Sequence, residues 1–118
     1  MFAHASVLIL GLLVTQPGGA SQPQQSVAVL AQAQDRCMAT YAVRLTRTEA
    51  ADEEIFSAAS EGCEQLSDQL NAAIAREYPA DQARELLTVI EANSRPNFIQ
   101  MLQRIRTDRQ NRAQGRVQ

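Results

Sequence analysis

Residues 37–63, CMATYAVRLTRTEAADEEIFSAASEGC, begin and end with the two cysteines of this chain, and they decide its fold. In one straight helix the two Cα atoms would lie about 39 Å apart, at about 1.5 Å per residue. A disulfide requires Cα atoms within about 7 Å of each other. An intramolecular disulfide and an unbroken helix therefore exclude each other, although nothing in residues 45–55 forces a helix to break.

The numbering favours a hairpin over the continuous helix. Two antiparallel helices joined at residue 50, midway between the cysteines, place residues whose numbers sum to 100 at the same height. This register pairs Leu45 with Ile55, Tyr41 with Ala59, Cys37 with Cys63, and Leu30 with Leu70. Because it aligns the apolar residues together with the cysteines, we predict a Cys37–Cys63 disulfide. The alternatives are an intermolecular disulfide and free thiols.

Apolar residues recur at steps of three or four, which is the period of an α-helix. The first stripe contains Leu30, Gln34, Cys37, Met38, Tyr41 and Leu45, and the second contains Ile55, Ala59, Cys63, Leu66, Leu70, Ile74 and Tyr78. Pro79 and Pro96 interrupt the pattern that follows. We predict a small all-α single domain: a disulfide-stapled antiparallel helical hairpin, residues 26–47 and 50–78, packed by two shorter helices, residues 81–93 and 96–110. In the third helix, Asp81 is the expected N-cap, and Ala83, Leu86, Leu87 and Ile90 form the expected inner face.

The N-terminal residues 1–20 have the pattern of a secretory signal peptide. An apolar run, VLILGLLV at residues 7–14, precedes a proline and two glycines and then Ala20, the expected cleavage site. The run is too short to span a membrane. We therefore expect an exported protein, in the bacterial periplasm, with a flexible N-terminus at residues 21–25, a helical domain at 26–110 and a frayed basic tail at 111–118. The alternative is a partly ordered N-terminal helix in a protein that is not exported.

The composition argues against catalysis and metal binding. Cleavage after Ala20 would remove His4, the single histidine, and all eleven basic residues are arginines. The 98 remaining residues then lack the usual general base and the commonest metal ligand, and they lack a Schiff-base lysine. The cysteine spacing matches no zinc motif, and the acids at Glu49, Asp52, Glu53 and Glu54 suit the first turn of a helix better than a calcium loop. We predict no enzyme activity, cofactor or metal.

One short motif has a counterpart in a known family. Residues 45–49, Leu-Thr-Arg-Thr-Glu, resemble the LTxxQ motif of small helical periplasmic chaperones, with Glu49 in place of glutamine. The pattern is that of a capping box, so the resemblance implies that a helix starts here. Residues 87–91 repeat the pattern inside a predicted helix, where they cannot cap. The resemblance carries no site residue over to this chain.

Charge is distributed unevenly, which bears on the choice of partner. Residues 35–91 hold twelve acids and five arginines, whereas residues 95–118 hold six arginines and Asp108. We predict a small exported non-enzymatic interaction protein, a chaperone-like, adaptor or inhibitor module whose partner is another protein. The alternative is a binder of anionic membrane or cell-wall polymer through an Arg-rich C-terminal helix, with Arg104, Arg109, Arg112 and Arg116 as the contacts. Nucleic acid is not expected, since no aromatic residue follows Phe98, and the oligomeric state is left open.

Overall fold

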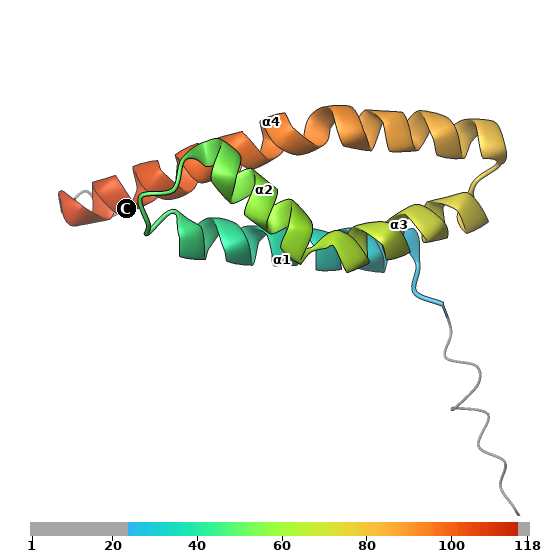
Figure 1. The fold of residues 1–118 in the computed structure, drawn as a ribbon, viewed down its shortest axis with the longest axis horizontal. Helices are drawn as coiled ribbons and strands as arrows, with labels where there is room; N and C mark the ends of the chain where they lie inside the picture. Colours follow the sequence, from blue (N-terminus) through green and yellow to red (C-terminus); the bar gives the residue numbers. More distant parts are fainter. Residues whose placement is uncertain (1–23, 116–118) are drawn as a thin grey trace, which may run out of the picture.

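The computed structural model describes residues 24–115, which form four helices (Figure 1). In chain order they are α1 (Val27–Leu45), α2 (Asp52–Gly62), α3 (Glu64–Glu77) and α4 (Ala80–Ala113). The described part contains no strand, and the prediction of a small all-α domain is confirmed. The predicted signal peptide, residues 21–23 and residues 116–118, including Arg116, lie outside the described residues.

The chain reverses direction between Leu45 and Asp52, as the cysteine spacing predicts. Thr48 closes the turn: its backbone N–H and its Oγ1 donate to the carbonyl oxygen of Leu45 at 3.0 and 2.6 Å, and its Oγ1 accepts from the N–H of Ala50 at 3.2 Å. These bonds satisfy backbone groups that the end of α1 leaves without a helical partner. The helix start expected at residues 45–49 is wrong, because Leu45 is the last residue of α1 and α2 begins only at Asp52.

The Cys37–Cys63 disulfide joins the middle of α1 to the junction of α2 and α3, with 6.0 Å between the Cα atoms. It uses both cysteines, so the alternatives with free or intermolecularly paired thiols do not apply. The second arm of the hairpin, predicted as one helix, divides at Cys63, whose φ of −108° and ψ of 10° lie outside the helical range. Gly62 precedes the break and destabilises a helix interior by about 1 kcal/mol relative to alanine. The ring of Tyr41 packs so closely on Gly62 that a Cβ there would overlap it.

The buried apolar side chains form two separate clusters along the hairpin. The disulfide cluster consists of Met38, Ala42, Ile55, Ala59, Cys63, Phe98 and Leu102. The α3 cluster consists of Leu30, Leu70, Ala73, Ile74 and Ala83. The predicted register holds, since Tyr41 and Leu45 pack against the first cluster with Ala59 and Ile55, while Leu30 and Leu70 share the second.

α4 is one helix of 34 residues, whereas the sequence predicted two shorter helices separated before Pro96. Proline keeps a helical φ but supplies no N–H to the carbonyl of Ala92, at a cost of about 3 kcal/mol inside a helix. Phe98 and Leu102, on the turns that follow, are 3% and 0% exposed. Burial of two such side chains contributes about 1.5–3 kcal/mol each, which is enough to offset the proline and keep the helix continuous.

The two ends of α4 also differ from the sequence prediction. The helix begins at Ala80 after Pro79, so Asp81 is not the N-cap and instead pairs with Arg84 at 2.5 Å. At the other end it continues to Ala113, past the predicted limit at residue 110. Gly115 then adopts a φ of 73°, the left-handed conformation that commonly follows a helix end.

Candidate partner-binding cleft

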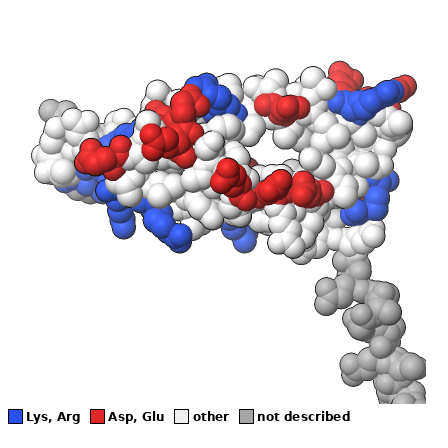
Figure 2. Space-filling view, in the orientation of Figure 1, with Lys and Arg blue, Asp and Glu red and all other residues white. Residues whose placement is uncertain are grey.

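A cleft lies beneath the middle of α4. On one side of it Ala83 is buried in the α3 cluster, and on the other side Phe98 and Leu102 are buried in the disulfide cluster. Every residue from 88 to 97, between these two supports, is exposed. α4 thus bridges the two clusters and leaves a cleft of about 1010 Å³ between its middle and the helices α1 and α3. Figure 2 shows it as an opening below α4.

Half of the residues that line the cleft are apolar. They are Ala31 and Met38 of α1, Phe56 of α2, Leu70 of α3, and Leu87, Val89, Ile90, Phe98 and Met101 of α4. Val89 and Ile90 are 50% and 36% exposed. Ile90 was expected on the inner face of the third helix, but it borders the cleft because α4 stands away from α1 and α3 at this point. Concave apolar surface of this size is typical of a binding site.

Gln34 places an unused hydrogen-bond acceptor beside the apolar lining. Its Nε2 donates to Oγ of Ser67 at 2.6 Å, which ties α1 to α3. Its Oε1 is buried and has no hydrogen-bond partner within residues 24–115. A buried acceptor without a partner costs about 1–3 kcal/mol. The sequence places Gln34 on the inner stripe but assigns it no role. A glutamine among apolar residues was the feature that could have indicated a polar group at this site.

The cleft carries net negative charge. Asp35 and Glu91 line it, and neither forms an ion pair in the described part of the chain. Arg95, the basic residue of the lining, is bound by Glu53 of α2, with 3.1 Å between Nε and Oε2. Its charge is therefore compensated within the protein, and the two carboxylates without an ion pair in residues 24–115 determine the charge of the cleft.

Three of the four predicted acids, Asp52, Glu53 and Glu54, lie in the first turn of α2. Glu49 precedes the helix, because α2 begins only at Asp52. Asp52 and Glu53 also form ion pairs with α4, through Arg106 and Arg95. The sequence does not predict these pairs, because the position of Arg106 beside α2 depends on the continuation of α4 through Pro96. They hold the middle of α4, through Arg95, and its C-terminal half, through Arg106, to α2.

The three described arginines of the predicted polyanion contact, Arg104, Arg109 and Arg112, fall within an arc of about 140° around α4, and Arg109 among them is bonded to α1. Arg109 donates from Nη2 to the carbonyl of Val43 and from Nη1 to Oγ1 of Thr46, each at 2.7 Å, so it caps the end of α1. At 3.6 residues per turn, Arg104 lies about 140° around α4 from Arg109. Arg112 is exposed.

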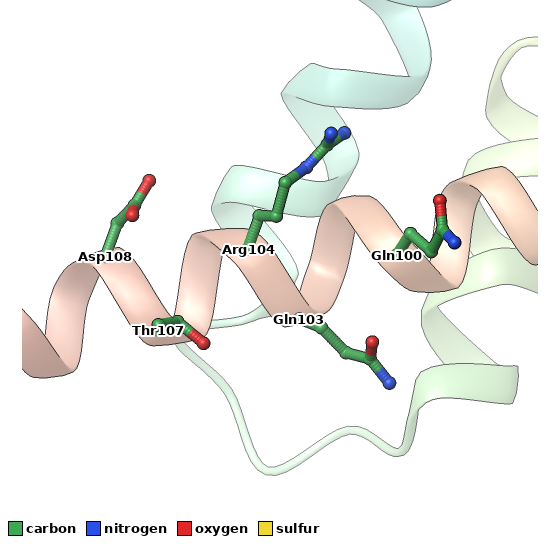
Figure 3. A pocket seen from close by; sticks show the side chains of 5 residues that line it. All are labelled: Gln100, Gln103, Arg104, Thr107 and Asp108. Atoms are coloured by element: carbon green, nitrogen blue, oxygen red, sulfur yellow. The ribbon is translucent and has the colours of Figure 1, made fainter.

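Arg104 borders a second hollow of about 290 Å³, which α4 alone lines. Its residues are Gln100, Gln103, Arg104, Thr107 and Asp108. Figure 3 shows Gln103 projecting from a different side of the helix than Arg104 and Gln100. With walls from a single helix and side chains that diverge, this hollow does not enclose a ligand.

The described residues offer neither a metal site nor a membrane-spanning helix. Residues 24–115 contain no group of three or more His, Cys, Asp or Glu side chains that could hold a metal ion. No helix among them combines the length and the apolar character needed to cross a membrane. Comparison with protein-family models, with curated proteins and with solved structures finds no match to this chain.

Proposed function

We propose that this protein is a small exported non-enzymatic interaction module, and that its cleft receives an apolar segment of another protein. The observation that carries this proposal is the apolar cleft between two separately packed clusters. A partner that covers Val89 and Ile90 removes apolar surface from water, which favours association by about 25 cal/mol per Å². An apolar surface of this kind suits a chaperone-like, adaptor or inhibitor module.

A non-enzymatic function agrees with the side chains at the cleft. Ser67 offers a hydroxyl on its wall, but that hydroxyl is hydrogen-bonded to Gln34. An amide cannot take the proton that a nucleophilic serine must lose. The cleft therefore lacks an activated nucleophile at this point.

Export to an oxidising compartment, the bacterial periplasm, is part of the proposal. Its support is the disulfide, since such bonds persist in oxidising compartments, together with the signal-peptide pattern of residues 1–20. Intact-mass measurement of the protein recovered from its native host tests it. A chain that begins at Ser21 is the expected result, and a full-length chain found in the cytosol alone would contradict it.

The cleft is tested by titrating the oxidised protein, residues 21–118, with a neutral amphipathic helical peptide. Shifts of the backbone resonances of Val89 and Ile90 and of the side-chain amide of Gln34 are expected. Ile90→Asp should abolish binding. Val43→Asp is the matched control, because Val43 is 43% exposed on α1 and does not line the cleft. Equal binding by both variants, or shifts confined to other surfaces, would refute a site in the cleft.

The alternative function, contact with an anionic membrane or cell-wall polymer, ranks second. Arg104 and Arg112 can serve it, whereas Arg109 is engaged with the end of α1. Binding to anionic vesicles that falls steeply with salt, and that Arg104→Ala combined with Arg112→Ala removes, would promote this alternative.

A further inference from the structure

We infer that the segment received by the cleft is a basic amphipathic α-helix of about two turns. This inference rests on the proposed function and specifies its partner. It follows from three features of the cleft: the secondary structure of its walls, its volume and its charge.

The walls favour a helix over an extended chain. They are formed by α1, α2, α3 and α4, whose backbone groups are engaged within the helices. An extended segment would need hydrogen bonds for its own N–H and C=O groups, and the described walls present no strand edge that could form them. A helix satisfies its backbone internally and presents only side chains, as in other helix-in-groove complexes.

The volume sets the length of the bound segment. A helical turn of about 10 Å diameter, side chains included, and 5.4 Å pitch occupies about 420 Å³. The cleft of about 1010 Å³ therefore holds about two turns. Two turns carry one apolar stripe, and that stripe can face Met38 and Leu70 on one wall and Ile90 on the other.

The negative charge of the cleft favours basic residues at the edges of the bound helix. Asp35 on α1 and Glu91 on α4 border the cleft from opposite walls. On α3, Glu64 and Asp68 are exposed beside the cleft residues Ser67 and Asn71. Figure 2 shows acidic side chains along the lower edge of the opening and above it.

A charge series tests the inference. Three helical peptides share one apolar face and carry lysine, glutamine or glutamate at the polar positions, and fluorescence anisotropy measures their affinity for the oxidised protein. We expect the lysine peptide to bind about ten-fold more tightly than the glutamine peptide, and the glutamate peptide to bind most weakly. Adding salt should reduce the preference for lysine.

A double variant, Asp35→Asn with Glu91→Gln, should bind the three peptides with nearly equal affinity while its affinity for the glutamine peptide stays unchanged. The matched control is Asp81→Asn with Glu85→Gln, two exposed acids of α4 outside the cleft, which should keep the preference for lysine.

The outcomes separate this inference from the proposed function. Equal binding of all three peptides by the unaltered protein, lost in Ile90→Asp, would overturn the basic helix and retain the cleft. No binding of any peptide would overturn both. A dimer in sedimentation equilibrium that Ile90→Asp dissociates would identify a second copy of this chain as the occupant, and would also overturn the basic helix.

Discussion

The two halves of α4 belong to one helix but meet the rest of the protein in different ways. From Phe98 onward the helix is packed on the disulfide cluster, paired with α2 through Arg106, and bonded to α1 through Arg109. Residues 88–97 are exposed throughout and span the cleft. α4 is therefore continuous as a helix, although its side chains are not packed against the protein along its whole length. Most helical stability in proteins comes from tertiary packing, so the packed segment from Phe98 onward, together with buried Ala83 at the other end, holds residues 88–97 in place.

The difference between the halves accounts for the cleft itself. Had the helix broken before Pro96, as the sequence predicts, the segment at residues 81–93 could have settled onto α1 and α3 and buried Ile90. Because α4 continues, the distance between its middle and the helices α1 and α3 is set by the buried contacts of Ala83 on one side and of Phe98 and Leu102 on the other. The candidate site thus arises at the point where the sequence prediction fails.

The largest expected effect contrasts one side chain from each half. Phe98→Ala should lower the free energy of unfolding by about 3–5 kcal/mol, because the ring is buried and packs against Phe56 with 5.5 Å between centroids. Ile90→Ala, in the exposed half, should change it by less than about 0.5 kcal/mol. Urea denaturation measures both. Similar losses in the two variants would show that residues 88–97 are packed in solution, and the contrast would fail.

Loss of the disulfide is the next largest effect. Replacing Cys37 and Cys63 together with alanine should lower the free energy of unfolding by about 3.5 kcal/mol, the entropy of closing a loop with a sequence separation of 26. Amide exchange should accelerate most in α1 and α2. Exchange in residues 88–97 should change least, since those residues do not contact the bond. Uniform acceleration across α4 would mean that its halves unfold as one unit.

Pro96→Ala should reduce the difference between the halves. Restoring the N–H that bonds to the carbonyl of Ala92 recovers about 3 kcal/mol, of which up to about 1 kcal/mol is lost because the unfolded chain becomes less restricted. A net stabilisation of about 2 kcal/mol is expected in urea denaturation, with slower amide exchange in residues 88–97. Destabilisation would show that the proline suits a local distortion of α4.

The smallest effect concerns the basic end of the packed half. Arg109→Ala should lower the free energy of unfolding by about 1 kcal/mol, because its two hydrogen bonds to α1 are charge-assisted but partly exposed to solvent. Arg112→Ala is the control and should have an effect within about 0.5 kcal/mol. Thermal denaturation compares the two variants. Equal effects would indicate that the bonds of Arg109 contribute nothing to stability in solution.

The hairpin could be predicted because one covalent constraint and one periodic pattern agreed. Cys37 and Cys63 required a reversal, and the register that joins them also aligns Leu30 with Leu70. The continuity of α4 could not be predicted in the same way. A proline removes one hydrogen bond, to the carbonyl four residues earlier, and this effect can be read from the sequence. The packing that outweighs it depends on where Phe98 and Leu102 dock in three dimensions.

The cleft was even harder to predict from the sequence than the continuity of α4. Periodicity identifies Ile90 as apolar and on the same face as Ala83, but the distance between that face and α1 depends on the two supports of α4. Likewise the charge of Arg109 is visible in the sequence, whereas its docking on Val43 depends on the path of the whole helix. The sequence identifies Gln34 as a polar residue on an apolar stripe. That its Oε1 has no hydrogen-bond partner within residues 24–115 is visible only in the structure.

The bond from Arg109 to the carbonyl of Val43 spans 66 residues and sets an order of assembly. As the chain emerges from the ribosome, α1 comes out first. The hairpin and its disulfide need only residues up to 77. The carbonyl of Val43 has a local donor in Oγ1 of Thr46, but the two bonds from Arg109 form only after residue 109 arrives, so the first helix to emerge is also among the last to gain its contacts.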